Sequence, residues 1–271
     1  MKIFAIQNEK DLPKRDLAYL FYYEREKEFY IELPEDADPW DTPLILSSFA
    51  SKGKWTVDSK WSHEWVRQRI IPYERQNIGR VLKDNKLKEY DEFALLMKGN
   101  GRCAQDDCFI KETEFDRLPH DIQERLNGGV TDTLPLDGTK MLVFFGNDEV
   151  KEYDFTGYFS EHKRFDVLLK HPDLFVNVKV LPGGRGLSWD CNLELLLYEF
   201  LDAGEKLPLR LEFFTEYLKR NTVNTAEAQE LLHCSRQYIS EMVKAGKLAP
   251  VKSSDKSTLF LKRDILELLD R

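Results

Sequence analysis

The feature that most constrains the fold is a pair of short helical patterns near the C-terminal end, separated by a turn of two residues. In both patterns apolar residues recur at spacings of three and four, which places them on one face of each helix. They are Ala228, Leu231 and Leu232 in the first helix, and Ile239, Met242 and Val243 in the second. Because only His233 and Cys234 form the turn, the apolar faces of the two helices must pack against each other.

Cap residues and surface residues agree with this interpretation. Thr225 is predicted to cap the first helix and Ser235 the second, because their hydroxyl oxygens can accept hydrogen bonds from free backbone amides. The polar residues left on the outer face of the second helix are Arg236, Gln237, Ser240, Glu241 and Lys244. Such a helix can enter the major groove of DNA while the first helix crosses the backbone. The amide groups at the Ser235 end can also meet a phosphate.

The residues after the second helix predict a two-stranded wing and a last helix. Gly246 ends the second helix. The two strands and their polar loop are expected at residues 247–252, 258–261 and 253–257. Asp264 is predicted to begin the last helix, with Glu267 completing a pair similar to a capping box. The buried stripe of that helix would be Ile265, Leu268 and Leu269.

The order of helix, turn, helix, wing and helix resembles the excisionase-like and MerR-like winged helix-turn-helix domains, over the stretch NTAEAQELLHCSRQYISEMVKAGKLAPVKSSDKSTLFLKRDILELL. The matching positions are Ala228, the Leu231-Leu232 pair, Ser235-Arg236-Gln237, Gly246-Lys247-Leu248 and Asp264. Two positions depart from the pattern. His233 stands where these domains usually have glycine, which requires a strained or left-handed backbone. Glu241 would repel phosphate unless it binds cytosine N4 or pairs with Lys244.

The resemblance implies double-stranded DNA as a partner. The residues that we predict to contact it are Thr225, Ser235, Arg236, Gln237, Tyr238, Ser240, Lys244, Lys247, Lys252 and Lys256. Arg236 and Gln237 are candidates for guanine and adenine edges, each worth on the order of 1 to 3 kcal/mol of discrimination when the contact is bidentate. Lys247, Lys252 and Lys256 would anchor phosphates. The competing interpretation is a three-helix interaction module whose polar face is solvated.

The charge of the chain limits the kind of DNA binding. Its formal net charge is −8, which argues against a protein that coats nucleic acid without regard to sequence. Residues 236–263 nevertheless carry seven basic side chains against two acidic ones. A small, locally basic DNA reader attached to acidic modules is therefore consistent with the total.

The rest of the chain predicts two further modules and an α+β fold class. We expect the first at residues 1–128, with antiparallel strands at 2–7, 17–23 and 29–33 followed by helices. The expected helices carry Trp61 and Trp65, then Ile78, Val81 and Leu82, and last residues 119–126 before the Asn127-Gly128-Gly129 turn. The helix-turn-helix domain itself is expected at residues 221–271.

The middle module is expected at residues 132–206. Two hairpins are predicted there, one from strands 140–145 and 149–155 and one from strands 175–181 and 185–189. The stretch FDVLLKHPDLFVNVKVLPGGRGLSWDCNLELLLYEFL resembles a small, uncharacterised bacterial α+β domain family. That resemblance implies no catalytic residues, and it associates the module with small regulatory or toxin-antitoxin-type genes.

Other residue clusters give weaker candidates. Trp61, Trp65 and nearby arginines could form a cationic aromatic surface, although a core role for the tryptophans and ion pairs for the arginines is the favoured interpretation. The segment 102–108 holds two thiols and two acids without a nearby histidine. The four cysteines form no CxxC pair, the histidines form no HExxH motif, and Gly183-Gly184-Arg185-Gly186 lacks the spacing of a phosphate loop. We therefore predict no metal, no cofactor and no catalytic residues.

Together these patterns predict a sequence-specific DNA-binding protein, a transcriptional regulator that acts by binding and is not an enzyme. We expect it in the cytoplasm, because neither an export signal nor a membrane span is visible. A homodimer or a protein partner is expected through the N-terminal modules. The alternatives are an excisionase-like accessory protein that bends DNA, an antitoxin-like protein, and an enzyme with its site in residues 1–128.

Overall fold

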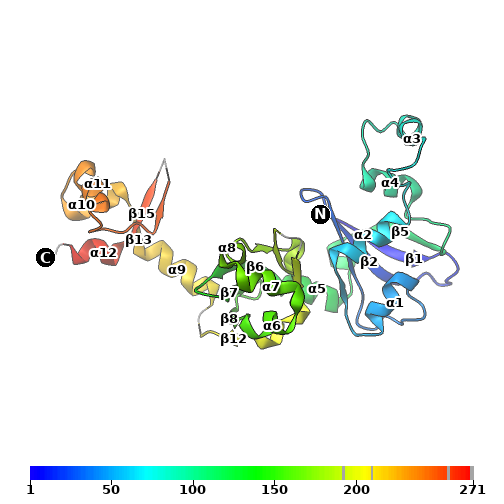
Figure 1. Ribbon diagram of the computed structural model, residues 1–271, viewed down its shortest axis with the longest axis horizontal. Coiled ribbons are helices and arrows are strands. Elements are labelled where there is room, and N and C mark those ends of the chain that lie inside the picture. Colours follow the sequence, from blue (N-terminus) through cyan, green and yellow to red (C-terminus); the bar gives the residue numbers. More distant parts are fainter. Residues whose placement is uncertain (191–192, 209, 255–256, 269–271) are drawn as a thin grey trace. The chain divides into compact units, whose positions relative to one another are not determined.

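The computed structural model describes residues 1–190, 193–208, 210–254 and 257–268. It combines helices with antiparallel sheets, which confirms the predicted α+β class (Figure 1). The chain divides into two compact units, Met1–Lys206 and Leu207–Arg271. The segments that we expected as two N-terminal modules thus lie within one unit. Among the described residues, no helix is both long enough and apolar enough to cross a membrane.

The first unit begins with a five-stranded antiparallel sheet in the order β4-β3-β2-β1-β5. Its strands are β1 (Lys2–Asn8), β2 (Asp16–Tyr23), β3 (Glu28–Glu32), β4 (Thr56–Val57) and β5 (Cys108–Thr113). The three strands predicted from the sequence are confirmed as β1, β2 and β3. The edge strands β4 and β5 were missed, because β4 has only two residues and β5 ends in polar residues.

Both faces of this sheet are buried, and successive residues of a strand enter different clusters. Phe4 and Ile6 belong to one cluster, with the helices that follow the sheet. Ile3 and Ala5 belong to another, which also holds Leu196 of the middle segment. This alternation follows from the two-residue period of a strand. The middle segment therefore completes the core of the N-terminal sheet, which explains why both segments form one compact unit.

Helices cover the first face. They are α1 (Leu44–Ala50), α2 (Ser59–Arg67) and α4 (Glu92–Gly99), whose residues enter the core cluster on that face. The helix α3 (Ile78–Asp84) has no buried residue and lies away from the sheet (Figure 1), and η1 (Phe115–Arg117) and α5 (His120–Asn127) lie further along the chain. Trp65 is fully buried, whereas Trp61, one turn earlier in α2, is 43% exposed. Of the two predicted core tryptophans, only Trp65 fills the core.

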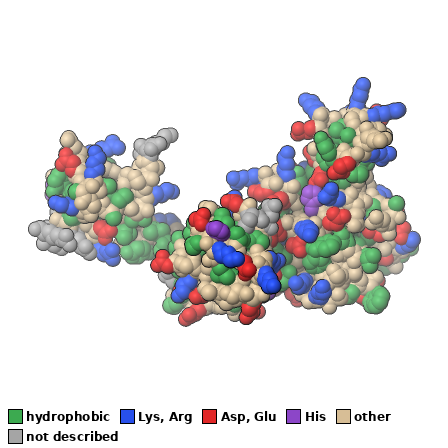
Figure 2. All heavy atoms as spheres, viewed as in Figure 1, with side chains coloured by type: hydrophobic (Ala, Val, Ile, Leu, Met, Phe, Trp, Pro, Cys, Tyr) green, Lys and Arg blue, Asp and Glu red, His purple; other side chains and the backbone are tan. Residues whose placement is uncertain are grey.

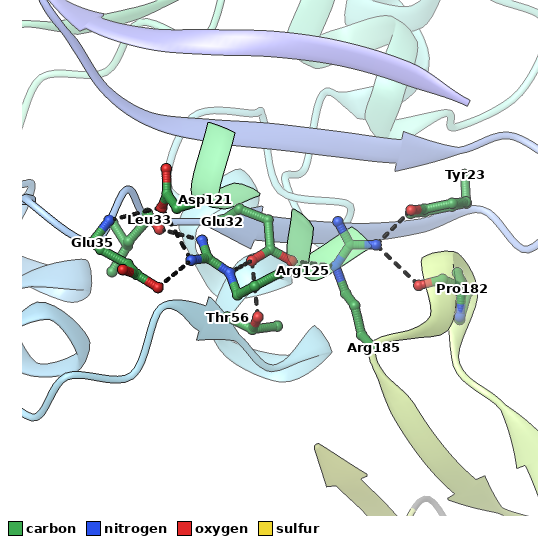
Figure 3. A network of polar contacts seen from close by, with 9 residues as sticks. All are labelled: Tyr23, Glu32, Leu33, Glu35, Thr56, Asp121, Arg125, Pro182 and Arg185. Carbon is green, nitrogen blue, oxygen red and sulfur yellow. Dashed lines mark hydrogen bonds and ion pairs between the residues drawn. The ribbon is translucent and has the colours of Figure 1, made fainter. Parts of the chain in front are cut away.

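A buried ion pair joins the middle segment to the N-terminal sheet (Figure 3). Arg185 Nε lies 2.6 Å from Glu32 Oε1, and both side chains are almost entirely buried. Thr56 donates a hydrogen bond of 2.8 Å to the other carboxylate oxygen of Glu32, and Arg125 of α5 lies 3.6 Å from it. The Arg185 guanidinium also lies 4.6 Å from the ring centroid of Phe21. Because such charges are costly to bury alone, the pair fixes the two segments against each other.

The middle segment contains two small antiparallel sheets. The first has the order β12-β8-β7-β6 and consists of β6 (Val130–Pro135), β7 (Lys140–Phe145), β8 (Val150–Asp154) and β12 (Glu205–Lys206). The second has the order β11-β10-β9 and consists of β9 (Lys179–Val180), β10 (Gly186–Trp189) and β11 (Leu193–Leu196). The helical pieces are α6 (Thr156–Glu161), η2 (Lys163–Phe165), α7 (Asp166–Lys170), α8 (Pro172–Phe175), η3 (Pro182–Gly184), η4 (Leu197–Glu199) and η5 (Leu201–Ala203).

The predicted hairpin of β7 and β8 is confirmed, and the second hairpin is confirmed only in part. Its first strand was predicted at 175–181, but Phe175 ends the short helix α8 and the strand begins at Lys179. Pro172 at the first helical position favours this helix. Phe175 remains in the core as predicted, where its carbonyl accepts a hydrogen bond of 3.0 Å from the Trp189 indole.

The second unit is small. Its elements are α9 (Leu211–Asn221), β13 (Thr222–Asn224), α10 (Thr225–Leu232), α11 (Arg236–Lys244), β14 (Lys252–Ser253), β15 (Thr258–Leu261) and α12 (Lys262–Glu267). The strands form a sheet in the order β13-β15-β14. Its core comprises Val223, Ala228, Ile239, Met242, Leu248, Phe260 and Ile265. The predicted inward faces of both helices are thus confirmed, while α9 and β13 were not foreseen.

Candidate DNA-binding surface

The turn between α10 and α11 has the left-handed backbone conformation that the sequence predicts. His233 is in the left-handed conformation, with φ 49° and ψ 42°, as its position predicted. The chain then enters α11 at Ser235, whose hydroxyl accepts a hydrogen bond of 3.2 Å from the Tyr238 amide. Ser235 is therefore the cap of α11, as predicted.

The cap of α10 differs from the prediction. Asn224, not Thr225, precedes the helix, and its side-chain oxygen accepts hydrogen bonds of 2.8 and 3.0 Å from the Ala226 and Glu227 amides. The Glu227 carboxylate in turn accepts a hydrogen bond of 2.8 Å from the Asn224 amide. This reciprocal capping box needs the carboxylate three positions after the cap, and only Asn224 has that spacing to Glu227. Thr225 is the first residue of the helix and is half-buried.

The two faces of α11 are sharply different. Ile239 and Met242 point into the core, with 2% and 6% of their surfaces exposed. The opposite side carries the predicted reader residues, all exposed: Arg236, Gln237, Tyr238, Ser240 and Lys244. Glu241 is also exposed, and it accepts a hydrogen bond of 3.5 Å from the Gln237 side chain, one turn away. The carboxylate thus contacts Gln237 and not Lys244, so a bidentate Gln237 contact with adenine requires this weak bond to open.

The wing follows α11 directly. Gly246 has φ 68°, a left-handed conformation that ends the helix, and Lys247 comes next on the surface. Lys252 is exposed on β14, which pairs with β15. The Ser254 amide closes the loop by donating a hydrogen bond of 2.8 Å to the Ser257 carbonyl. Lys256, the last predicted phosphate anchor, lies outside the described residues.

The last helix begins earlier than predicted. Leu261 is its cap residue, with no side-chain hydrogen bond, and the helix starts at Lys262. Asp264 therefore lies in the first turn, not at the cap, because β15 runs straight into the helix and sets where it begins. Ile265 is fully buried as predicted, and Leu269 lies outside the described residues.

Residues 222–271 match a family model described as a helix-turn-helix domain. The C-terminal segment is a helix-turn-helix domain. It carries the exposed polar face of α11 and the wing side by side, the arrangement by which such domains bind DNA. No curated protein and no solved structure matches the chain. The match does not extend to residues 165–201, whose resemblance to an uncharacterised bacterial family stays a prediction.

The surface of the helix-turn-helix domain is not uniformly polar. Figure 2 shows Lys and Arg side chains on this unit, and it also shows hydrophobic side chains gathered over α9. Sequence reasoning missed this helix, because no segment before residue 221 was assigned to the domain. The signal was present: apolar residues at 211, 214 and 218 have helical spacing.

The chemically interesting cluster at residues 102–108 is occupied by structural contacts. Asp106 pairs with Arg69, whose side chain is buried and stacks 3.7 Å from the ring centroid of Trp65. Burial raises the pKa of the Cys108 thiol to about 12, which leaves it protonated and unreactive at neutral pH. Among the residues that the structure describes, no three His, Cys, Asp or Glu side chains gather in a way that could hold a metal.

A cavity of about 920 Å³ opens between α2 and β11 in the first unit. The Glu194 carboxylate lies at its wall, accepting hydrogen bonds from the hydroxyl and the amide of Ser59. Burial raises the pKa of Glu194 and that of the neighbouring Asp58. The charge of Asp58 further raises the pKa of Glu194, and the charge of Glu199 further raises that of Asp58. Lys54 lies at the cavity, 5.1 Å from the ring centroid of Tyr198.

Proposed function

We propose that the protein is a sequence-specific DNA-binding regulator that reads a short site through α11. The observation that carries this proposal is the outer face of α11, where Arg236 and Gln237 are exposed directly after the Ser235 cap and Ser240 is exposed one turn further along. None of these three side chains is needed for packing. An exposed guanidinium and amide at a helix that can enter the major groove are the groups that read guanine and adenine edges.

The wing supports the proposal with positive charge. Lys247 and Lys252 are exposed on either side of the turn from α11 into the wing, where side chains meet phosphates in winged domains. The protein would act by binding and not by catalysis. We favour a regulator of transcription over an excisionase-like or an antitoxin-like protein. An excisionase-like protein would bend its DNA, and a circular permutation assay measures that bending.

The test begins with selection of duplex DNA from a pool of random sequences by the full chain. The selected duplex is then used to compare wild type with the double variant Arg236→Ala, Gln237→Ala. We expect the double variant to lose on the order of 10- to 1000-fold in affinity for the selected site, and far less for random DNA, because each base contact contributes roughly 1 to 3 kcal/mol.

A matched control removes one positive and one neutral polar side chain elsewhere in the same unit. Lys219→Ala with Thr215→Ala does this on the exposed polar side of α9. It should bind the selected site as wild type does at the same salt concentration, since both residues belong to α9 and neither lies on α11 or the wing. Failure to enrich any sequence, or equal affinity of wild type and the α11 variant, would reject the proposal.

A further inference from the structure

The helix α9 stands out by its exposure, because three of its large apolar side chains are exposed and the other two, Leu211 and Leu218, are only half-buried. None of its residues is buried, although it carries five large apolar side chains. Their positions are Leu211, Phe213, Phe214, Tyr217 and Leu218. At 100° per residue these five fall on one side of the helix, while Glu212, Thr215, Glu216, Lys219 and Arg220 fall on the other. The helix is thus built to bury one face.

The exposed area is concentrated in aromatic rings. Phe213 is 58% exposed, Tyr217 is 48% exposed and Phe214 is 37% exposed. Scattered single apolar residues are ordinary on a protein surface, but contiguous ones mark an interaction site. Figure 2 shows this gathering of hydrophobic side chains over α9.

The helix is held firmly to the DNA-reading part of its unit. Asn221 ends α9 and the next residue, Thr222, begins β13, which pairs with the wing strand β15. The Thr222 hydroxyl donates a hydrogen bond of 2.7 Å to the Leu218 carbonyl, and the Asn221 amide group donates one of 2.9 Å to the Tyr217 carbonyl. The direction of α9 is therefore tied to that of the wing.

We propose that the apolar face of α9 pairs with α9 of a second copy of this chain, so that two helix-turn-helix domains bind neighbouring half-sites. This rests on the proposed function. A second copy fits because two identical apolar faces of equal length match each other about a two-fold axis. Glu212, Glu216 and Lys219 lie on the opposite side of the helix. Arg220 lies at the edge of the apolar face, about 20° from Phe213, where it pairs with Glu216 and keeps its charge at the rim of the pairing. One such domain reads only a few base pairs, and a pair of them reads a full site.

The size of the face sets the strength of the pairing. At roughly 200 Å² for each aromatic side chain, the exposed parts of the three rings amount to about 300 Å² per copy, or about 600 Å² for the pair. Stable interfaces bury roughly 1,200 Å² or more. The helix pair alone is thus a weak dimer in solution, and it forms readily once DNA holds two copies close together.

Sedimentation velocity of the full chain, from roughly 1 μM to 500 μM, tests the pairing without DNA over the range of weak complexes. We expect the average mass of wild type to rise with concentration. The variant Phe213→Ser, Tyr217→Ser should stay monomeric, and it should fold normally because neither residue is buried. As a control, Trp40→Ser removes a side chain that is 94% exposed in the first unit, and it should self-associate as wild type does.

Duplexes that carry one or two copies of the selected site test the pairing on DNA. Wild type should fill the second site roughly 5- to 150-fold more readily than the first, the usual range of coupling between sites. The α9 variant should bind the single site with unchanged affinity and lose this cooperativity.

The outcomes separate the two proposals. If no DNA site is selected, the proposed function fails while the sedimentation result still decides the pairing. Wild type that stays monomeric at every concentration and binds two sites independently would overturn the pairing. Self-association that persists in the α9 variant would also overturn it, because the interface would then lie elsewhere.

Discussion

The sheet of the first unit and the helices of the second differ in how much of their surface is covered by the rest of the unit. Both faces of the β1–β5 sheet are covered, and the charges that enter its core are paired, as in Arg185 with Glu32. In the second unit one small core holds three strands and short helices together, while the outer face of α11 and the apolar face of α9 stay uncovered. The side chains on both faces of the sheet in the first unit thus pack inside that unit. In the second unit, the side chains on the outer face of α11 and on the apolar face of α9 can contact other molecules.

The largest expected effect tests how strongly the first unit depends on its internal pairing. Arg185→Leu removes the closest cationic partner of the buried Glu32 carboxylate and leaves only Thr56 and the more distant Arg125, so the free energy of unfolding of Met1–Lys206 should fall by about 3 kcal/mol. Calorimetry of the full chain measures this. Arg164→Leu is the control, because its pair with Glu199 is half exposed and is worth about 1 kcal/mol or less. A transition that stays in place in Arg185→Leu would mean that the pair does not hold the two segments together.

The second prediction applies the same test to the small core of the helix-turn-helix domain. Met242→Ala should destabilise Leu207–Arg271 by about 2 to 5 kcal/mol, because Met242 is only 6% exposed between the helices and its removal leaves a cavity. DNA binding should disappear while the calorimetric transition of the first unit remains. Leu266→Ala, at 41% exposure in α12, should change little. Simultaneous loss of both transitions would show that the two units do not fold independently.

A smaller effect concerns the start of α11. Ser235→Ala removes the hydroxyl that accepts the Tyr238 amide, and it should lower the stability of the second unit by about 1 kcal/mol. Urea unfolding followed by helical circular dichroism measures this. Ser240→Ala makes the same chemical change on the exposed face of the same helix and should leave stability unchanged or slightly higher. Equal losses in the two variants would contradict the role of Ser235 as a cap.

The smallest expected effect is the pH dependence of stability, which should differ in sign between a buried and a surface carboxylate. Burial raises the pKa of Glu194, so the folded state binds its proton more tightly than the unfolded state does. Stability therefore falls as pH rises from the ordinary value of 4.5 through the raised pKa. Glu194→Gln removes this loss, and it should match wild type in acid and exceed it at neutral pH.

The surface control has the opposite sign. A hydrogen bond from Lys206 lowers the pKa of Glu149, so its stabilisation is present at neutral pH and is lost as pH falls through the lowered pKa. Glu149→Gln should thus be less stable than wild type at neutral pH and equal to it in acid. Thermal melts across the pH range measure both variants. Curves of the same sign would contradict the assignment of Glu194 as a destabilised, partly buried acid.

The sequence predicted those features that depend on neighbours along the chain. The spacing of Ile239 and Met242 fixed the inner face of α11, and the position of His233 indicated its left-handed turn. The strands β1 to β3 were visible as apolar runs. In each case a local rule and the final packing agree.

The features that sequence reasoning missed depend on distant contacts. Nothing near Arg185 indicates that Glu32, far away in the chain, will pair with it, and a glycine-rich turn gave no hint of a buried charge. Leu196 packs against the second face of the N-terminal sheet, far from it in sequence. The boundary predicted between residues 128 and 132 therefore falls inside one compact unit. The cap of α10 was placed one residue late, because Asn224 and Thr225 both have suitable side chains and only the reciprocal bond with Glu227 distinguishes them.

The direct passage from Asn221 of α9 to Thr222 of β13 has a geometric consequence for any DNA that two copies share. One residue inserted at this point would turn α9 by about 100° and advance it by about 1.5 Å relative to the wing. The apolar faces would then meet only if the two reading helices were rotated around the DNA axis to a different phase. The number of residues between α9 and β13 thus sets the distance between the half-sites that two paired copies can bind. Variants with residues inserted at this junction should prefer half-sites with a different spacing.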